Sequence, residues 1–345
     1  MKGCTAALVR PILETGQLRS LCRNNTECVG FRSIVTRNVT QMYGPVLNRF
    51  GFKDVAVLVL INIDLARHKH TIAHRRGGIE AKLKIIGSHD AKPGEFPHMV
   101  SLQLELPGVP NFHICGGSII SNRWILSTSK CMHIREDFAM ATKFFVVAGK
   151  HDLSTREDTE QAIEVKKYYT HAKYDVNNGG PYDIALILLQ SPLTFNTRVR
   201  AINLPTRGSN PVGKGTICGW GDMKKEDDPQ IQPILQTTTV SVIDRKRCSE
   251  LMRKIRSDKG VNFEANIDDT NICTEVNEVN DGSSCEGDAG NPLIVEDKNK
   301  RKELVGLASW WLEPCGSTAA PTAYTKVSLF LDWISLIQSV VPEDD

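Results

Sequence analysis

Three short stretches of the sequence hold the residues that decide which chemistry the chain can perform. Lys130 lies beside a cysteine, Asp183 lies in the apolar run 182–189, and Ala289 lies in the stretch 285–292, Cys-Glu-Gly-Asp-Ala-Gly-Asn-Pro. An unperturbed lysine has a pKa of roughly 10.4 and stays protonated at neutral pH, so it is a poor proton acceptor. A methyl group cannot attack a carbonyl. Only the aspartate, therefore, is an ordinary participant in nucleophilic catalysis.

Short strands and turns must position these residues. Pro93 to Pro97 forms a turn signal, residues 99–104 follow it with strand composition, and residues 182–189 form a near-continuous apolar strand. Apolar residues recur at helical spacing near the end of the chain, at Phe330, Trp333, Ile334 and Ile337. Many short strands, frequent turns and one terminal helix predict an all-β fold of the barrel type.

The stretch 285–292 resembles the Gly-Asp-Ser-Gly-Gly-Pro loop of chymotrypsin and trypsin-like serine proteases, with Ala289 at the serine position. Lys130 stands where that family has its catalytic histidine, and Asp183 matches the third triad residue. Further landmarks follow in the family's order between residues 85 and 341. The resemblance implies two six-stranded antiparallel barrels packed face to face, with a C-terminal α-helix and no cofactor.

Two functions from different classes follow. Ala289 and Lys130 predict that the chain is not an enzyme but a catalytically inactive homologue that binds proteins, for example host plasma or defence proteins of a cascade such as complement. Similarity of residues 198–205 and 245–248 to mite group 3 allergen proteases, and to inactivated scabies mite paralogues, favours this interpretation. The alternative is a serine-type endopeptidase with residual or unusual activity. Ser-Lys catalysis exists, but Ala289 offers no hydroxyl to activate.

The resemblance also assigns the loop and its activation junction. Gly287 and Asp288 are expected to be what remains of the oxyanion loop, and Lys84-Ile85 resembles the junction where cleavage frees an apolar N-terminus. In the family that new ammonium pairs with the aspartate before the serine, here Asp288. Lys130 is expected to neutralise Asp183 as a buried ion pair, although both side chains being solvated is the alternative.

The former specificity pocket is expected at four positions. Ser283 stands where trypsin-like relatives have an aspartate, which does not support a preference for Arg or Lys. Ser309 and Trp311 belong to the strand against which substrate pairs, and Thr322 replaces a second wall glycine. A Trp side chain covers roughly 150 to 250 Å². Trp311 is expected to fill or roof the pocket, or else to swing outward as a contact residue.

Ten cysteines without CxxC pairs or Cys/His clusters indicate disulfides and a secreted protein. By resemblance, three bridges are expected, which leaves Cys218 as a buried odd thiol; the pairs are Cys115–Cys131, Cys248–Cys273 and Cys285–Cys315. No metal is expected, because Lys150 stands at one end of the stretch where some relatives chelate calcium between acidic residues.

Charge divides the chain into a basic leader and an acidic body. Residues 1–84 have 14 Lys and Arg against 5 Asp and Glu, and residues 85–345 have 28 against 35, so the net charges are +9 and −7. An acidic body disfavours nucleic-acid binding. Residues 1–41 are expected to be an extension, 42–66 a signal peptide without a membrane span, 67–84 a propeptide, and 85–345 a monomeric protease-like domain.

Overall fold

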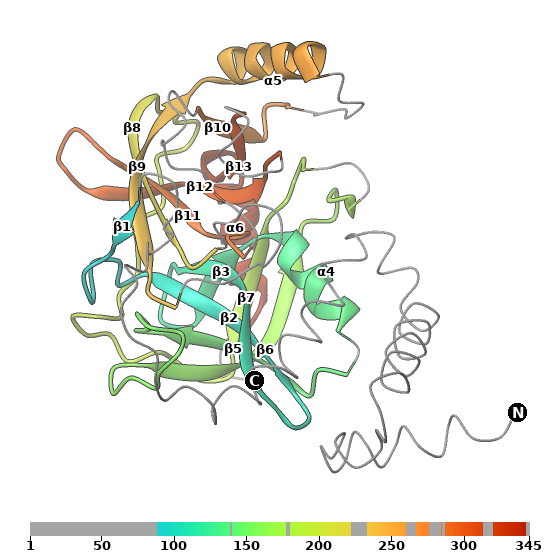
Figure 1. Ribbon diagram of the computed structural model, residues 1–345. Coiled ribbons are helices and arrows are strands. Elements are labelled where there is room, and N and C mark those ends of the chain that lie inside the picture. Colours follow the sequence, from blue (N-terminus) through green and yellow to red (C-terminus); the bar gives the residue numbers. More distant parts are fainter. Residues whose placement is uncertain are drawn as a thin grey trace, which may run out of the picture. The chain divides into compact units, whose positions relative to one another are not determined.

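The computed structural model of this 345-residue chain describes residues 88–138, 140–176, 180–221, 233–259, 267–275, 284, 287–312 and 320–342 (Figure 1). The predicted extension, signal peptide, propeptide and Lys84-Ile85 junction lie outside the described residues. Ser283 and the Cys285–Cys315 pair also lie outside them. None of the helices in the described ranges is long and apolar enough to cross a membrane.

The first half of the described chain closes into a six-stranded antiparallel barrel with the strand order β2-β3-β4-β7-β6-β5. Its strands are β2 (Met99–Leu106), β3 (Val109–Ile119), β4 (Trp124–Ser127), β5 (Lys143–Ala148), β6 (Gln161–Thr170) and β7 (Ala185–Leu189). β7 is buried along its whole length, which explains why its sequence is a continuous apolar run rather than an alternating one.

The second half forms another closed barrel with the order β8-β9-β10-β13-β12-β11, in which β11 pairs back to β8. Its strands are β8 (Gly213–Gly219), β9 (Gln236–Ile243), β10 (Asn271–Glu275), β11 (Pro292–Glu296), β12 (Lys302–Trp310) and β13 (Thr322–Lys326). The short strand β1 (His89–Asp90) is added to β9. The predicted all-β fold of two six-stranded barrels is confirmed.

One apolar cluster joins the two barrels. It contains Trp124 and Leu186 from the first barrel together with Ile294 and Leu307 from the second, all at most 2% exposed. Burying a Leu or Ile side chain contributes about 1.5 to 3 kcal/mol, so this shared core fixes the barrels against each other. Residues near the seam are therefore held rigidly.

Among the described residues, three α-helices accompany the barrels: α4 (Ser129–Asp137), α5 (Arg245–Lys259) and α6 (Leu331–Val340), the last preceded by the 3₁₀ turn η3 (Val327–Leu329). Phe330 and Ile334 are buried in the shared core, and Trp333 and Ile337 pack against it. The helical spacing at the end of the sequence thus reflects packing against the protein body.

In the part of the chain that the structure describes, disulfides link Cys115 to Cys131 and Cys248 to Cys273. The first ties β3 to the start of α4, the helix that carries Lys130. Cys218 is a buried free thiol near the end of β8, and burial raises its pKa. A protonated buried thiol behaves as a small apolar side chain.

Candidate functional site

Asp183 lies at the entrance to β7, where Tyr182 takes a positive φ of 61° and turns the chain into the strand. Its side chain is 1% exposed. Ser309 Oγ donates to Asp183 Oδ2 at 2.6 Å, and the Lys130 backbone N–H donates to Oδ1 at 2.8 Å. Burial raises the pKa of the carboxyl to about 6, although these hydrogen bonds and the Lys130 charge oppose the shift.

Lys130 lies in the first turn of α4, where backbone N–H groups have no partner inside the helix. This explains why its N–H is available to Asp183. The side chain reaches Trp311 instead, and the ammonium nitrogen lies 4.8 Å from the centroid of that ring. Lys130 thus meets Asp183 through its backbone N–H and through its charge, which lowers the pKa of the carboxyl, while its ammonium also makes a cation–π contact. The buried ion pair stays a prediction.

The loop at Ala289 is shaped by two glycines with positive φ, Gly287 at 87° and Gly290 at 81°. A Cβ at Gly290 would lie only 2.3 Å from the Gly116 carbonyl oxygen, so a larger residue does not fit there. The Gly116 N–H donates to the Ala289 carbonyl at 2.8 Å, and the Gly290 N–H donates to the Ala308 carbonyl at 2.8 Å. Both barrels therefore hold the loop.

Asp288 is buried inside this loop, at 2% exposure. One of its carboxylate oxygens accepts hydrogen bonds from the Gly221 N–H at 2.9 Å and from Asn291 Nδ2 at 2.6 Å. The Asn291 N–H donates to the Asp288 carbonyl at 2.9 Å. The predicted partner, the N-terminus that cleavage before Ile85 would create, lies outside the described residues.

Comparisons with known proteins identify the family of this chain. The family model described as "Trypsin" matches residues 85–334. The chain belongs to the trypsin-like serine protease family. It is 34% identical over 260 residues to "Lectizyme" of Glossina austeni, covering 73% of this chain and 85% of that protein. It is 34% identical over 253 residues to "Trypsin-1" of Astacus astacus, covering 72% and 98%. It is 32% identical over 255 residues to "Coagulation factor IX" of Cavia porcellus, covering 72% and 80%.

These relatives contradict the prediction that the chain is not an enzyme, because they carry the names of serine proteases and match it over most of its length. That prediction was wrong. It treated two side chains as the whole of catalysis, whereas the backbone loop and substrate binding contribute a share of their own. Lys130 and Ala289 remain facts of this trypsin-like sequence, and they bear on its rate and mechanism.

A buried histidine contacts the loop of this trypsin-like protein. It was not among the site residues predicted from the sequence. His113 lies on β3 with its Nδ1 2.8 Å from Ser101 Oγ and its Nε2 3.0 Å from the Gly287 carbonyl oxygen. Gln103 Nε2 donates to the same serine oxygen at 3.0 Å. Burial lowers the pKa of His113 to about 4, so the ring stays neutral and donates from one nitrogen only. The signal in the sequence that could have indicated this contact is the presence of polar residues, Ser101, Gln103 and His113, on the otherwise apolar strands β2 and β3.

The predicted pocket residues take separate places in the trypsin-like fold. Ser309 is buried and bonds Asp183. Thr322 is buried at the start of β13, opposite Thr274. Trp311 is half-buried, packs against the first barrel's core and covers the Lys130 amine. The indole therefore sits directly beside the residue at the histidine position.

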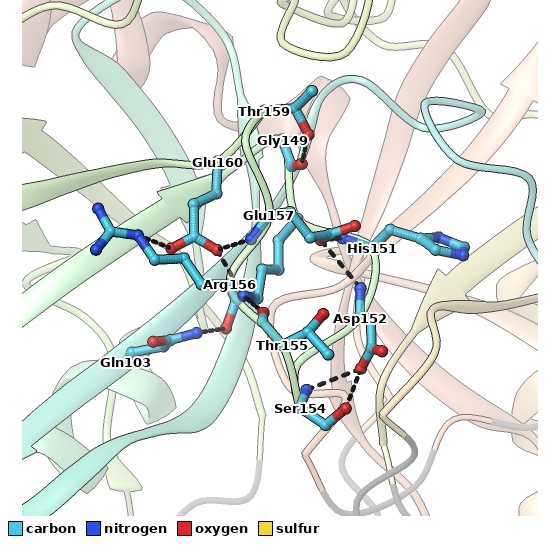
Figure 2. A network of polar contacts seen from close by, with 12 residues as sticks. Gln103, Gly149, His151, Asp152, Ser154, Thr155, Arg156, Glu157, Thr159 and Glu160 are labelled. Atoms are coloured by element: carbon cyan, nitrogen blue, oxygen red, sulfur yellow. Dashed lines mark hydrogen bonds and ion pairs between the residues drawn. The ribbon is translucent and has the colours of Figure 1, made fainter.

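Residues 149–160 form a network of polar contacts that includes Glu157 and Glu160 (Figure 2). Within this loop the ammonium of a lysine lies among oxygen atoms. Lys150 Nζ lies 2.6 Å from Glu160 Oε2 and donates to the Thr155 carbonyl, while the side chain is 7% exposed. Glu157 accepts from the backbone N–H of His151 and Asp152. Within the described ranges, no cluster of three His, Cys, Asp or Glu is suited to hold a metal ion.

Proposed function

We propose that this trypsin-like chain descends from serine-type endopeptidases and retains a residual, unusual peptidase activity. Water, rather than a serine hydroxyl, attacks the peptide carbonyl at the loop of residues 287–290. The backbone N–H groups of Gly287 and Ala289 polarise that carbonyl as an oxyanion forms. The observation that carries the proposal is the loop itself, which two positive-φ glycines and a buried Asp288 hold in a fixed shape.

The expected rate follows from what the chain keeps and what it has replaced. Serine proteases that lose nucleophile and base lose about a millionfold in turnover, yet about 10³ to 10⁴-fold over water remains through the oxyanion hole and binding. Ala289 removes the covalent step, and Lys130 removes the imidazole. Slow turnover in that residual range is the activity proposed.

Lys130 is the proposed proton acceptor. Asp183 is fully buried and hydrogen-bonded, so it positions the first turn of α4 and does not touch substrate. The Lys130 amine, by contrast, is half-buried under Trp311 at the site. A neutral amine takes one proton from the attacking water as its oxygen bonds the carbonyl carbon, and passes it to the departing amide nitrogen. The rate should therefore rise with pH.

A second candidate function is the capture of protein segments, which the position of Trp311 over Lys130 favours. A bound segment that is cut slowly leaves mainly by dissociation, so the chain would compete with active proteases for substrates or inhibitors. Host defence proteins of a complement-like cascade are the proposed targets, in keeping with the resemblance to the mite paralogues. Secretion is proposed with it, and disulfides are compatible with an oxidising compartment.

The test is hydrolysis of a broad peptide library by the chain beginning at Ile85, beside an Ala289→Ser, Lys130→His double variant. The parent is expected to cut slowly with a rate that rises with pH, and the double variant to cut at least a thousandfold faster. A matched Lys130→Met variant should lose the pH dependence. A parent no faster than the uncatalysed reaction, beside an active double variant, would leave binding as the function of this site.

A further inference from the structure

We infer that Asn291 is a positioning residue that holds Asp288, and with it the oxyanion loop, in place before the chain is cut at Lys84. The inference deepens the proposed function, because it concerns how the same site is formed. Asn291 departs from the Gly-Asp-Ser-Gly-Gly-Pro pattern, which has a glycine at this position. Its side chain supplies an amide donor where glycine has none.

The amide lies directly against the carboxylate. Asn291 Nδ2 is 2.6 Å from Asp288 Oδ1, and both residues are at most 3% exposed. A hydrogen bond to a buried charged group contributes about 1.5 to 3 kcal/mol. The same oxygen also accepts the Gly221 N–H, so the Asn291 amide and this backbone group both stabilise the carboxylate.

The surroundings are shaped to admit this pair. A Cβ at Gly116 would lie 1.6 Å from Asn291 Oδ1, and one at Gly219 would lie 2.0 Å from Asn291 Nδ2. A Cβ at Gly221 would lie 2.3 Å from the Asp288 carboxyl carbon. Three glycines from two segments, β3 and the end of β8, thus leave room for one amide and one carboxylate. A side chain at any of them would displace the pair.

The side-chain carbonyl oxygen of Asn291 indicates that this arrangement serves the loop rather than general stability. Oδ1 is buried and makes no hydrogen bond with the described residues. An unpaired buried acceptor costs free energy, about 1 to 3 kcal/mol. The chain therefore keeps an amide at a cost in order to place its NH₂ group on Asp288. Asp288 in turn fixes the peptide groups of Gly287 and Ala289.

The experiment measures amide hydrogen exchange in residues 287–291 without any substrate, so a failure of the proposed peptidase activity does not affect it. The Gly290 and Asn291 N–H groups report the loop, since both are hydrogen-bonded in it. Full-length chain carrying Lys84→Gln, which cannot be cut there, is compared with chain cleaved to begin at Ile85. The parent loop should exchange within threefold of the same rate in both forms.

Asn291→Ala should speed exchange of these two amides at least tenfold in the uncut chain. In the cleaved chain the new Ile85 ammonium should pair with Asp288 and restore most of the protection, which a merely structural role of Asn291 would not produce. Asn203→Ala, which removes an exposed asparagine bonded to the Lys302 carbonyl, is the matched control and should change nothing in the loop.

Two results would overturn the inference. One is an uncut Asn291→Ala chain whose loop amides exchange as slowly as those of the parent. The other is a loss of protection that cleavage does not restore. If Asn291→Ala also lowers protection in the strands of both barrels, Asn291→Ser replaces it, since its hydroxyl can still donate. The loop amides of the serine variant should exchange at a rate between those of the parent and the alanine variant. If they exchange as slowly as in the parent, in both the uncut and the cleaved chain, the role of Asn291 is refuted.

Discussion

Replacing Ser309 by alanine should destabilise the protein by an amount that depends on pH. Ser309 Oγ donates to Asp183 Oδ2 at 2.6 Å, and the carboxyl is fully buried with its pKa raised to about 6. At pH 7.5 the lost bond is to a charged group and should cost about 1.5 to 3 kcal/mol. At pH 5 the folded-state carboxyl is mostly protonated, and the cost should fall to about 1 kcal/mol.

The assay is urea unfolding of parent and Ser309→Ala at both pH values. Thr325→Val is the matched control, because Thr325 Oγ1 donates at 2.6 Å to the backbone carbonyl of Asp183, which does not titrate. The control should cost the same free energy at pH 7.5 and pH 5. An Ser309→Ala penalty equal at the two pH values would refute the reasoning that the serine acts on the ionised carboxylate.

Two further predictions concern buried charge elsewhere in the fold. Burial lowers the pKa of His98 to about 3 and that of His113 to about 4, so below about pH 6.5 both histidines bind protons in the unfolded chain but not in the folded chain. The pKa of Asp183 is raised to about 6, so this carboxyl binds its proton more readily in the folded chain and has the opposite effect on stability. The unfolded chain therefore binds about one proton more than the folded chain, and the free energy of unfolding should fall by about 3 kcal/mol between pH 6 and pH 4. A His113→Gln variant whose free energy of unfolding, measured in urea titrations, falls as steeply with pH as that of the parent would contradict this prediction. Lys150→Met should lower the free energy of unfolding by about 2 to 4 kcal/mol, because it removes the nearer cation of the Glu160 carboxylate and leaves the more distant Arg156, at 4.0 Å, to pair with it. A chelator that lowers the melting temperature of the parent would instead show that a metal, not the ammonium, occupies that loop.

The fold was predictable because its signals are local. Residues 182–189 are apolar without interruption, and the structure buries all of β7. The helical spacing of Phe330 and Ile334 matches their place in the core. Turn residues and strand composition carry such information along the chain, so the barrels could be expected before any contact was known.

The geometry of the site was less predictable, because it depends on competition among partners distant in sequence. The Asp183 carboxylate takes a backbone N–H at the start of α4 and the hydroxyl of Ser309, a residue expected in the pocket. The Lys130 amine then lies against Trp311. No spacing in the sequence says which of several donors a buried carboxylate accepts. The same holds for His113, whose partner Gly287 is 174 residues away.

The prediction that the chain is not an enzyme failed for a related reason. Ala289 and Lys130 describe two side chains, whereas the loop shape comes from glycines, a buried carboxylate and backbone bonds to both barrels. Rate enhancement that arises from backbone N–H groups and binding is not visible in the identity of the triad positions.

The most direct test of the central claim is peptide hydrolysis after treatment with an organophosphorus reagent that modifies reactive serine hydroxyls. Contaminating serine proteases are blocked by it, but Ala289 offers no hydroxyl to modify. The account predicts slow hydrolysis that survives the reagent, follows the protein through a final gel-filtration column and rises with pH. Hydrolysis that drops to the rate of peptide in buffer after treatment would contradict it.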